Sequence, residues 1–375
     1  MPFPVTVLLD HDAPSETFIR REIELLRQRG WELHVRYLTH GADTLRPLCP
    51  FRLLGLSRIA KMFRHSPLDA LRILKRLPQA AALAQDLTET KSRLVWAQFA
   101  GITADIVGIA AATLKLPWIC SVHAHDVFTP SPKVLAFRLR DARRIIACSQ
   151  AAADASGIAR ERVEVIHHGI QVAHGVPAVP NTNVIFSAGR LESKKGFDVL
   201  LRACALLHAR NIPFVCRIAG KGRLDSELRR LAEDLHIEEH VTFLDWLSPE
   251  QVFDEIRRAR VVALASRRLP NGDRDGIANI VLEALAAGTP VVTTTAGAAG
   301  EVIEDGVNGR LVPPDNPEAL AHALAEVLAG PDVCQRFAGA GRRVIEARFD
   351  PVLNIGELEK VLLWADAAKT RTRAR

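Results

Sequence analysis

The sequence predicts an α/β protein built from two Rossmann-like domains that face each other across a cleft. Three observations support this fold class. The chain has 375 residues, more than one ordinary hydrophobic core accommodates. Strand-like and helix-like stretches alternate almost throughout, as expected when parallel strands are joined by crossover helices. A segment rich in proline, Gln171–Asn183, interrupts both periodicities near the middle of the chain.

The first half of the chain alternates between short apolar strands and longer helices. Six strands are predicted, at Val5–Leu9, Glu32–Leu38, Leu94–Gln98, Trp118–Val122, Arg144–Ala147 and Val163–Ile166. Helices are predicted over Glu16–Gln28 and Leu68–Leu87, with further helical segments between the later strands.

The second half repeats the alternation after the proline-rich segment. Its six predicted strands are Val184–Ser187, Phe214–Ala219, Val241–Leu244, Val261–Ala265, Pro290–Thr294 and Gly309–Val312. Its helices are expected at Phe197–Arg210, Leu224–Leu235, Pro249–Arg258, Asn279–Ala287 and Pro317–Leu328, and Val333–Ala368 is helical in character. We therefore expect a first domain at residues 1–172, a linker at 173–183, a second domain at 184–348 and a helix with a basic tail at 349–375.

The composition, with 48% hydrophobic and 25% charged residues, is that of a globular protein in water. No apolar run reaches the roughly 18 residues that a membrane-spanning helix needs. The six cysteines are scattered without a Cys-x-x-Cys pair. This pattern favours reduced, buried thiols in a cytoplasmic protein over disulfides or a zinc site.

The net charge of +6 is matched by one segment, residues 51–78, which holds seven Lys/Arg and one Asp. Its basic residues alternate with apolar ones at helical spacing, which suits an anionic membrane surface or a polyanionic acceptor. The alternative is a pair of helices whose arginines are merely solvated. The chain contains a single tyrosine and no aromatic residues interleaved with basic strands, so we expect no nucleic-acid partner.

In the second half, the stretch from Arg274 to Gly288 combines a loop carboxylate, Asp275, with a predicted helix start. Free amides near Gly276, Ile277 and Ala278 would form a phosphate site at that helix N-terminus. Glu283, one turn into the helix, can accept hydrogen bonds from a vicinal diol such as a ribose. The alternative is an ordinary helix start with one solvated glutamate.

Other polar residues follow neighbouring strands and should meet at the same sheet edge. Arg190 and Lys195 follow the strand that ends near Gly189, and their charges can neutralise a diphosphate. Gly220 lets the backbone approach a ligand closely, and Leu244 lies where it can border a base. Each of these residues also has a plain structural explanation as a turn residue or a solvated cation.

In the first half, His123, His125 and Asp126 follow the fourth strand. A histidine can handle a proton near neutral pH, and Asp126 can orient it. If the strand continued, the two histidines would lie on opposite faces, so one of them would enter the cleft. A metal site formed by these three residues is the alternative, but a fourth ligand is lacking. Ser15, Glu16 and Thr17 open the first helix, whose free amides should also face the cleft.

Five stretches of the second half resemble the donor-binding domain of the retaining GT-B glycosyltransferases of family 4: SAGRLESKKGFDVLL, IAGKGR, VTFLDWL, RDGIANIVLEALAAGTPVVTT and EVIEDGVNGRLVPPDNPEAL. In the first half, APSETFIRREIELLRQRGWEL and SVHAHDVF are similar to the branch that builds exopolysaccharides, including colanic-acid-type enzymes. The resemblance covers nearly the whole chain. It implies that the last helix crosses back to pack on the first domain.

The resemblance also implies a role for each candidate residue. His123, Asp126 and Asp275 would be catalytic, with Asp275 contacting the transferred sugar. The donor would be bound by Gly189, Arg190, Lys195, Gly220, Leu244, Gly276, Ile277, Ala278, Asn279 and Glu283. The acceptor would be bound by Ser15, Glu16, Thr17 and His125. The resemblance implies that no metal is needed. No cofactor is expected either, because the nucleotide sugar, linked to UDP or GDP, is a substrate.

The implied activity is a retaining transfer of a sugar to a glycan or a lipid-linked oligosaccharide, at or near the inner face of the cell membrane. The sequence departs from the family pattern at Asp275, where glutamate is usual, and at Ala278 and Gly300, which replace prolines. No proposed chemical group is lost at these positions. Two alternatives are a sugar-nucleotide epimerase with the same fold and a non-catalytic protein that binds sugar nucleotides.

Overall fold

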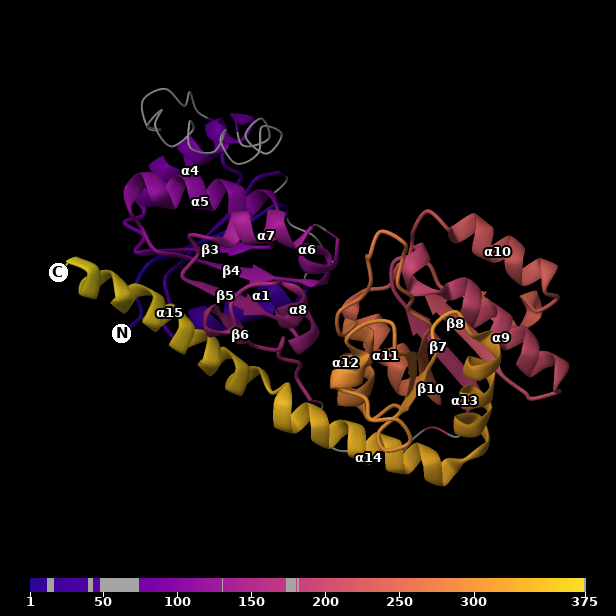
Figure 1. Ribbon diagram of the computed structural model, residues 1–375. Coiled ribbons are helices and arrows are strands. Elements are labelled where there is room, and N and C mark those ends of the chain that lie inside the picture. The colour runs from indigo at the N-terminus through magenta and orange to yellow at the C-terminus, as the bar shows by residue number, and fades with distance from the viewer. Residues whose placement is uncertain are drawn as a thin grey trace. The chain divides into compact units, whose positions relative to one another are not determined.

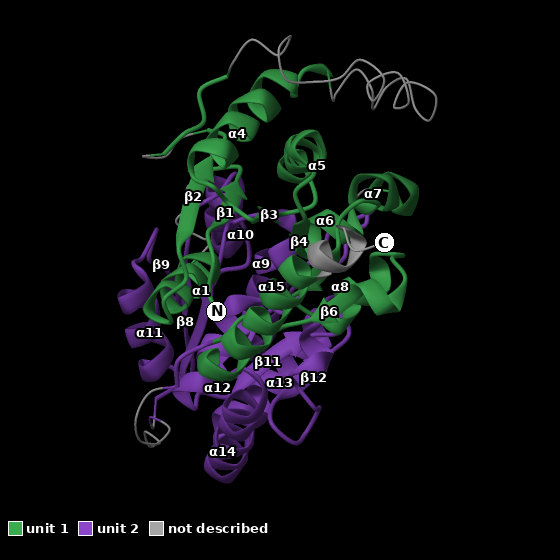
Figure 2. Cartoon of the chain, turned by 90° about the vertical axis from the view of Figure 1, so that its left-hand side faces the viewer, with its two compact units in different colours: residues 1–169, 351–375 green, residues 170–350 purple. Residues whose placement is uncertain are grey.

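A computed structural model describes residues 1–11, 17–39, 43–47, 74–129, 131–172, 180 and 182–373, with side chains described as far as residue 367. The chain divides into two compact units (Figures 1 and 2). Unit 1 comprises residues 1–169 and 351–375, and unit 2 comprises residues 170–350. The predicted linker at 173–183 and the basic segment at 51–78 lie largely outside the described residues, so their roles stay predictions.

Unit 1 alternates strands and helices as the sequence predicts. Its elements are β1 (Val5–Leu9), α1 (Thr17–Gln28), β2 (Leu33–Tyr37), α4 (Leu77–Glu89), β3 (Leu94–Gln98), α5 (Ile102–Leu114), β4 (Trp118–Val122), α6 (Ala124–Phe128), α7 (Pro132–Leu139), β5 (Arg144–Ala147), α8 (Gln150–Ala155), β6 (Val163–Val165) and α15 (Pro351–Arg373). The six strands are parallel, in the order β2-β1-β3-β4-β5-β6.

Helices cover both faces of this sheet, which explains why the central strands read as unbroken apolar runs. Ile19, Ile23 and Leu26 of α1 recur at helical spacing, and all three are buried against one face. The same face is covered by α15, which buries residues such as Ile355 and Leu362. The opposite face is covered by α4 and α5. The predicted return of the C-terminal helix to the first domain is therefore confirmed.

Unit 2 contains a second parallel sheet with helices on both faces. Its elements are β7 (Val184–Ala188), α9 (Phe197–Ala209), β8 (Val215–Ala219), α10 (Asp225–Asp234), β9 (Val241–Phe243), α11 (Pro249–Arg258), β10 (Val261–Leu264), α12 (Asn279–Ala287), β11 (Val291–Thr294), β12 (Arg310–Val312), α13 (Pro317–Ala329) and α14 (Pro331–Arg348). The predicted fold class of two Rossmann-like halves is thus confirmed.

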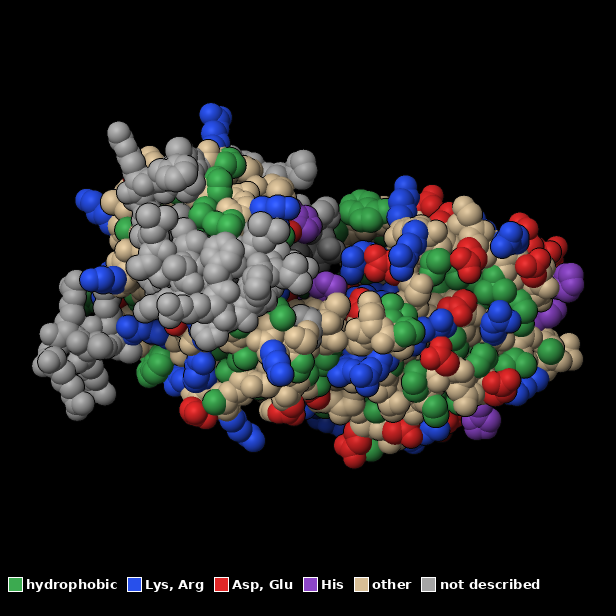
Figure 3. Space-filling view, turned by 45° about the horizontal axis from the view of Figure 1, so that its top comes forward, with side chains coloured by type: hydrophobic (Ala, Val, Ile, Leu, Met, Phe, Trp, Pro, Cys, Tyr) green, Lys and Arg blue, Asp and Glu red, His purple; other side chains and the backbone are tan. Residues whose placement is uncertain are grey.

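The surface of unit 2 mixes both signs of charge. Acidic and basic side chains are interspersed over the part of this unit that Figure 3 displays, to the right of the picture. Among the described residues, no helix is both long enough and apolar enough to cross a membrane.

The chain passes from unit 2 back to unit 1 at a break between two helices. The predicted helical segment Val333–Ala368 is interrupted after Arg348, and α15 restarts at Pro351. The backbone of Gly169 lies so close to this proline that a Cβ atom on Gly169 would stand 2.4 Å from the Pro351 Cα. A glycine is therefore required where β6 leads out of unit 1.

Candidate functional site

The strands of unit 2 lie in the order β12-β11-β10-β7-β8-β9. From β7 the chain adds strands first on one side and then, from β10, on the other, so the position between β7 and β10 is the switch point of the sheet. The loops that follow two such strands separate at the carboxyl edge of the sheet and leave a crevice, where open α/β sheets bind ligands. Residues Gly189–Lys195 follow β7, and residues Ala265–Ala278 follow β10. The sheet therefore places most of the predicted donor-binding residues at its switch point.

Lys195 and Asp275 form a buried ion pair between these two loops. The Lys195 Nζ donates to Asp275 Oδ2 at 2.8 Å, and Ser266 Oγ donates to the same oxygen at 2.7 Å. Burial raises the pKa of a carboxyl group, but the Lys195 ammonium and the Ser266 hydroxyl outweigh it and hold the pKa of Asp275 below its ordinary value. The pair is thus charged and held in place near neutral pH.

Two glycines allow the loops to approach each other this closely. Gly196 adopts a φ of 66°, and a Cβ atom there would lie 1.9 Å from the Ala265 carbonyl oxygen. A Cβ atom on Gly220, after β8, would lie 1.9 Å from the carbonyl oxygen of Gly189. Any larger residue would push the loops after β7, β8 and β10 apart. The glycines therefore set how closely these three loops approach one another at the carboxyl edge of the sheet.

The helix α12 begins at this edge without a side-chain cap. Its N-cap residue is Ala278, which has no side chain able to accept from the first-turn amides. The preceding loop is fixed by its backbone, since Ala298 N–H donates to the Gly276 carbonyl at 3.3 Å. Glu283 is half-buried one turn into the helix. The first-turn amides of α12 therefore have no side-chain cap at this sheet edge, and their predicted binding of an anion stays a prediction.

The remaining predicted donor residues lie around this cluster. Arg190 is 62% exposed, and its Nη1 lies 3.4 Å from Glu192 Oε1. Leu244 follows β9, and its N–H donates to the carbonyl of Ile218 at 2.8 Å. Arg190 thus faces solvent, whereas Lys195 is the buried cation of the pair.

In unit 1, His123 lies at the end of β4 and forms the N-cap of α6. Its ring is buried beside Phe18 and Phe99, with centroid distances of 5.3 and 4.5 Å. Burial and the neighbouring His168 lower the pKa of His123 well below its ordinary value, so the ring is neutral near pH 7. Its Nε2 is buried and has no hydrogen-bond partner among the described residues.

Asp126 and His125 are arranged differently from the expectation. The strand ends at Val122 and the chain turns into α6, so the two histidines do not alternate along a strand. His125 is exposed on α6, while the buried Asp126 accepts the backbone N–H of His123 at 3.0 Å. Burial raises the pKa of Asp126 to about 6. The alternative metal site of His123, His125 and Asp126 is not formed, because among the described residues the ligand atoms of these three side chains do not come together.

Three further residues, Glu22, Cys148 and His168, lie around His123. His168, after β6, lies with its ring centroid 5.3 Å from that of His123, and its Nδ1 donates to Glu22 Oε1 at 2.8 Å. Burial lowers the pKa of a histidine, but Glu22 and Cys148 together raise that of His168 to about 10. Cys148 follows β5, and the possible ligand atoms of His123, Cys148 and His168 lie within 4.8 Å of one another.

The acceptor residues predicted at the first helix are only partly described. Thr17 is the first residue of α1, whereas Ser15 and Glu16 lie outside the described residues. Ser266 could have been found by the rule that located the other residues, because it directly follows a predicted strand. Glu22 carries no such signal, since it is one of several charged residues on an amphipathic helix.

The Asp275 carboxylate provides a prediction for stability. We expect Asp275→Asn to lower the free energy of unfolding of unit 2 by roughly 3–5 kcal/mol at pH 7, because it leaves the Lys195 charge buried and unpaired. The folded pKa of Asp275 lies below the unfolded value of about 3.9, so this contribution is complete above that pH and is lost as the pH falls through the folded pKa.

Urea unfolding of both proteins between pH 3 and pH 8 would check this expectation. The two curves of stability against pH should run parallel above pH 5 and converge in acid. Asp332→Asn, at an exposed position of α14, is the control and should change stability by less than about 0.5 kcal/mol. A stability difference that stays constant down to pH 3 would contradict the paired, charged state of Asp275.

The chain contains two Rossmann-like units, and the second has a cation and a helix N-terminus at its switch point. This is the architecture of the GT-B glycosyltransferases. Two family models match the sequence in succession. The model described as "Glycosyltransferase Family 4" matches residues 15–174, and "Glycosyl transferases group 1" matches residues 174–344. The chain belongs to these glycosyltransferases, as the sequence motifs predicted.

Two of the relatives are named for the biosynthesis of colanic acid and of amylovoran. The putative colanic acid biosynthesis glycosyltransferase WcaL of Escherichia coli is 34% identical over 173 residues, which is 45% of this chain and 43% of the relative. The amylovoran biosynthesis glycosyltransferase AmsK of Erwinia amylovora is 30% identical over 178 residues, covering 48% of this chain and 44% of AmsK. The matched part of the chain thus spans less than half the length of these relatives.

Solved structures share the fold over nearly the whole chain. HepE of Anabaena, in complex with UDP and glucose, superposes with a TM-score of 0.73 at 21% identity, covering 96% of this chain and 99% of HepE. Sucrose-phosphate synthase of Thermosynechococcus elongatus gives a TM-score of 0.75 at 18% identity, covering 97% of this chain and 99% of the synthase. At these identities the likeness establishes the fold alone.

Proposed function

We propose that this protein is a retaining glycosyltransferase that moves a sugar from a UDP- or GDP-linked donor to a glycan or lipid-linked oligosaccharide during the synthesis of a surface polysaccharide. The observation that carries the proposal is the buried Lys195–Asp275 pair beside the uncapped start of α12, at the switch point of unit 2. The names of WcaL and AmsK support the polysaccharide context. The HepE complex with UDP and glucose supports a nucleotide-sugar donor.

The donor would bind to unit 2. The first-turn amides of α12 and the Lys195 ammonium provide positive charge for the diphosphate, and Glu283 accepts the ribose hydroxyls. Asp275 anchors Lys195 and would contact the hydroxyls of the transferred sugar. Because Lys195 and the amides already supply the positive charge, the donor site requires no metal ion.

The reaction breaks the bond between the anomeric carbon and the donor phosphate oxygen. A bond forms between that carbon and the acceptor hydroxyl oxygen, on the same face of the sugar. The proton of the acceptor hydroxyl passes to the departing diphosphate, and the developing negative charge is stabilised by Lys195 and the α12 amides. His123, neutral and with an available Nε2, would hold a hydroxyl group of a reactant on the side of unit 1.

Donor binding tests this proposal directly. A panel of UDP, GDP and their sugars should contain a ligand that stabilises unit 2 by about 2.7 kcal/mol when its free concentration is 100 times Kd. Differential scanning fluorimetry would record this as a rise in Tm of roughly 5–10 °C. Glu283→Gln should weaken binding of the same ligand about 10–100-fold, because a charged hydrogen-bond acceptor is lost.

Glu318→Gln is the matched control. This glutamate is exposed in the first turn of α13, within the same unit, and its replacement should leave the ligand shift unchanged. If no nucleotide or sugar nucleotide raises the Tm, the proposed donor site is wrong. If Glu283→Gln affects acceptor affinity and spares the donor, Glu283 does not contact the ribose.

A further inference from the structure

Three potential metal ligands converge at the carboxyl edge of the sheet in unit 1. His123 follows β4, Cys148 follows β5 and His168 follows β6, and these strands are consecutive neighbours in the sheet. Each residue offers one nitrogen or sulfur atom, and these atoms lie within 4.8 Å of one another. The topology therefore gathers two imidazoles and a thiol that are distant in the sequence.

A buried atom without a partner lies within this group. Nε2 of His123 has no hydrogen-bond partner among the described residues, although the ring is buried. Such atoms are rare in native proteins and often mark the position of an ordered water or an ion. The cluster also lines a cavity of about 10 Å³, roughly the space that one water-sized occupant needs.

His168 is held in the orientation that a metal ligand requires. Its Nδ1 donates to the Glu22 carboxylate at 2.8 Å, so Nε2 is the nitrogen left for a metal. Histidine ligands of metals commonly donate their second nitrogen to a carboxylate in this way.

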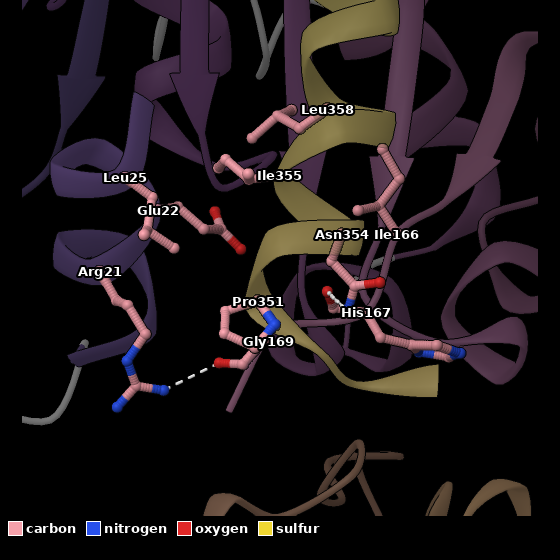
Figure 4. A pocket seen from close by; sticks show the side chains of 10 residues that line it. All are labelled: Arg21, Glu22, Leu25, Ile166, His167, Gly169, Pro351, Asn354, Ile355 and Leu358. Carbon is pink, nitrogen blue, oxygen red and sulfur yellow. Dashed lines mark hydrogen bonds between the residues drawn. The ribbon is translucent and has the colours of Figure 1, made fainter. Parts of the chain in front are cut away.

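The backbone on both sides of His168 is fixed as well. Asn354 of α15 donates to the His167 carbonyl at 2.9 Å, and Arg21 of α1 donates to the Gly169 carbonyl at 2.8 Å, as Figure 4 shows. The segment therefore has little freedom to rotate the His168 ring away from the cluster.

We propose that His123 Nε2, Cys148 Sγ and His168 Nε2 bind one thiophilic divalent cation of the zinc class, with water as the fourth ligand. Two imidazoles and a thiolate suit such ions and do not suit Mg²⁺ or Ca²⁺, which prefer oxygen ligands. Bonds of about 2.0 Å to nitrogen and about 2.3 Å to sulfur place ligand atoms roughly 3.5 Å apart, so binding would draw the three side chains together by about 1 Å. This site lies on unit 1 and shares His123 Nε2 with the proposed transfer reaction, so a bound ion would exclude a substrate hydroxyl from that nitrogen.

A proton competes with the metal for this site. Imidazole and cysteine bind metals in their deprotonated forms, so metal binding at this cluster would release protons and depend on pH. The affinity should therefore be lower than that of a dedicated structural zinc site.

Cobalt is the appropriate probe, because a Co²⁺ ion bound by a thiolate gives a charge-transfer absorption band. The full chain, freed of metals by chelation, should bind one equivalent of Co²⁺ with this band, and Zn²⁺ should displace it. Cys148→Ser should abolish the band, and Glu22→Gln should weaken binding about 10–100-fold. Cys120→Ser, which removes a buried thiol of β4 outside the cluster, should keep the band.

Circular dichroism of each variant would establish that unit 1 is folded before titration. The proposal is overturned if the wild-type chain shows no saturable cobalt binding. It is equally overturned if the charge-transfer band survives in Cys148→Ser, since another thiol would then be the ligand. Neither readout requires transferase activity, so a failure of this proposal and a failure of the proposed function can be told apart.

Discussion

Lys195→Ala should reduce the rate of sugar transfer by roughly 10²–10³-fold, the loss typical when one group that stabilises developing charge is removed. Lys195 is the buried cation at the switch point of unit 2, with its Nζ 2.8 Å from Asp275. Without it, the charge of the departing diphosphate would be stabilised by the α12 amides and the exposed Arg190 alone. Steady-state kinetics with the nucleotide sugar identified by the binding panel would measure the effect on kcat.

The same substitution has a structural cost that must be separated from catalysis. Removing Lys195 leaves the buried Asp275 carboxylate with the hydrogen bond from Ser266 but without its ion pair, which should destabilise unit 2 by roughly 3–5 kcal/mol. The double variant Lys195→Ala with Asp275→Asn removes both charges. We expect it to recover much of the stability and to remain inactive.

Lys194→Ala is the matched control for this experiment. Lys194 is the neighbouring residue, is also buried, and pairs with Asp273 at 3.2 Å. Its loss should destabilise unit 2 in a similar way and leave kcat close to that of the wild type. Near-normal transfer by Lys195→Ala, or an equal loss in Lys194→Ala, would show that Lys195 has no specific role at the diphosphate.

The strands were the most predictable part of the fold. Val5–Leu9, Leu94–Gln98, Trp118–Val122 and Arg144–Ala147 have the predicted bounds. These strands are buried on both faces, so each reads as a short apolar run limited by polar or turn residues. The helical character of Val333–Ala368 was predicted together with a domain boundary at 348/349, and the break between α14 and α15 falls there. Pro351 is its local signal, because proline is tolerated in the first turn of a helix and disfavoured in the interior.

The positions of the proposed donor residues in the fold were predictable, because parallel strands bring their carboxyl ends to one edge of the sheet. Lys195 and Asp275 are 80 residues apart, yet both follow strands that flank the switch point. The sequence places them at the same sheet edge but does not reveal that they form an ion pair. That contact depends on Gly196, whose close approach to Ala265 is a property of the folded loops.

The cluster around His123 could not be predicted in the same way. Glu22 is 146 residues from His168, and it lies on a helix whose other charged residues look identical in the sequence. Cys148 resembles the other scattered, buried thiols. Their convergence depends on the neighbouring positions of β4, β5 and β6 and on how α1 packs on the sheet, which no local pattern encodes.

His123→Ala should lower kcat/KM for transfer by at least about 100-fold, within the range of positioned side chains that handle protons or hold reacting hydroxyls. The ring is buried and neutral, and its Nε2 has no partner among the described residues, so a substrate hydroxyl is the partner that the proposed reaction provides. His123→Gln retains a hydrogen-bond donor in a similar volume and should recover part of the activity. His322→Ala, at an exposed position of α13, should leave activity unchanged.

Binding of the nucleotide distinguishes a role of His123 in transfer from a general loss of structure. His123 belongs to unit 1, whereas the proposed diphosphate site belongs to unit 2, so the Tm shift caused by UDP or GDP should survive in His123→Ala. Normal transfer by this variant would remove His123 from the reaction. A loss of transfer together with an intact nucleotide shift would place its contribution after donor binding, where the acceptor and the sugar are brought into position.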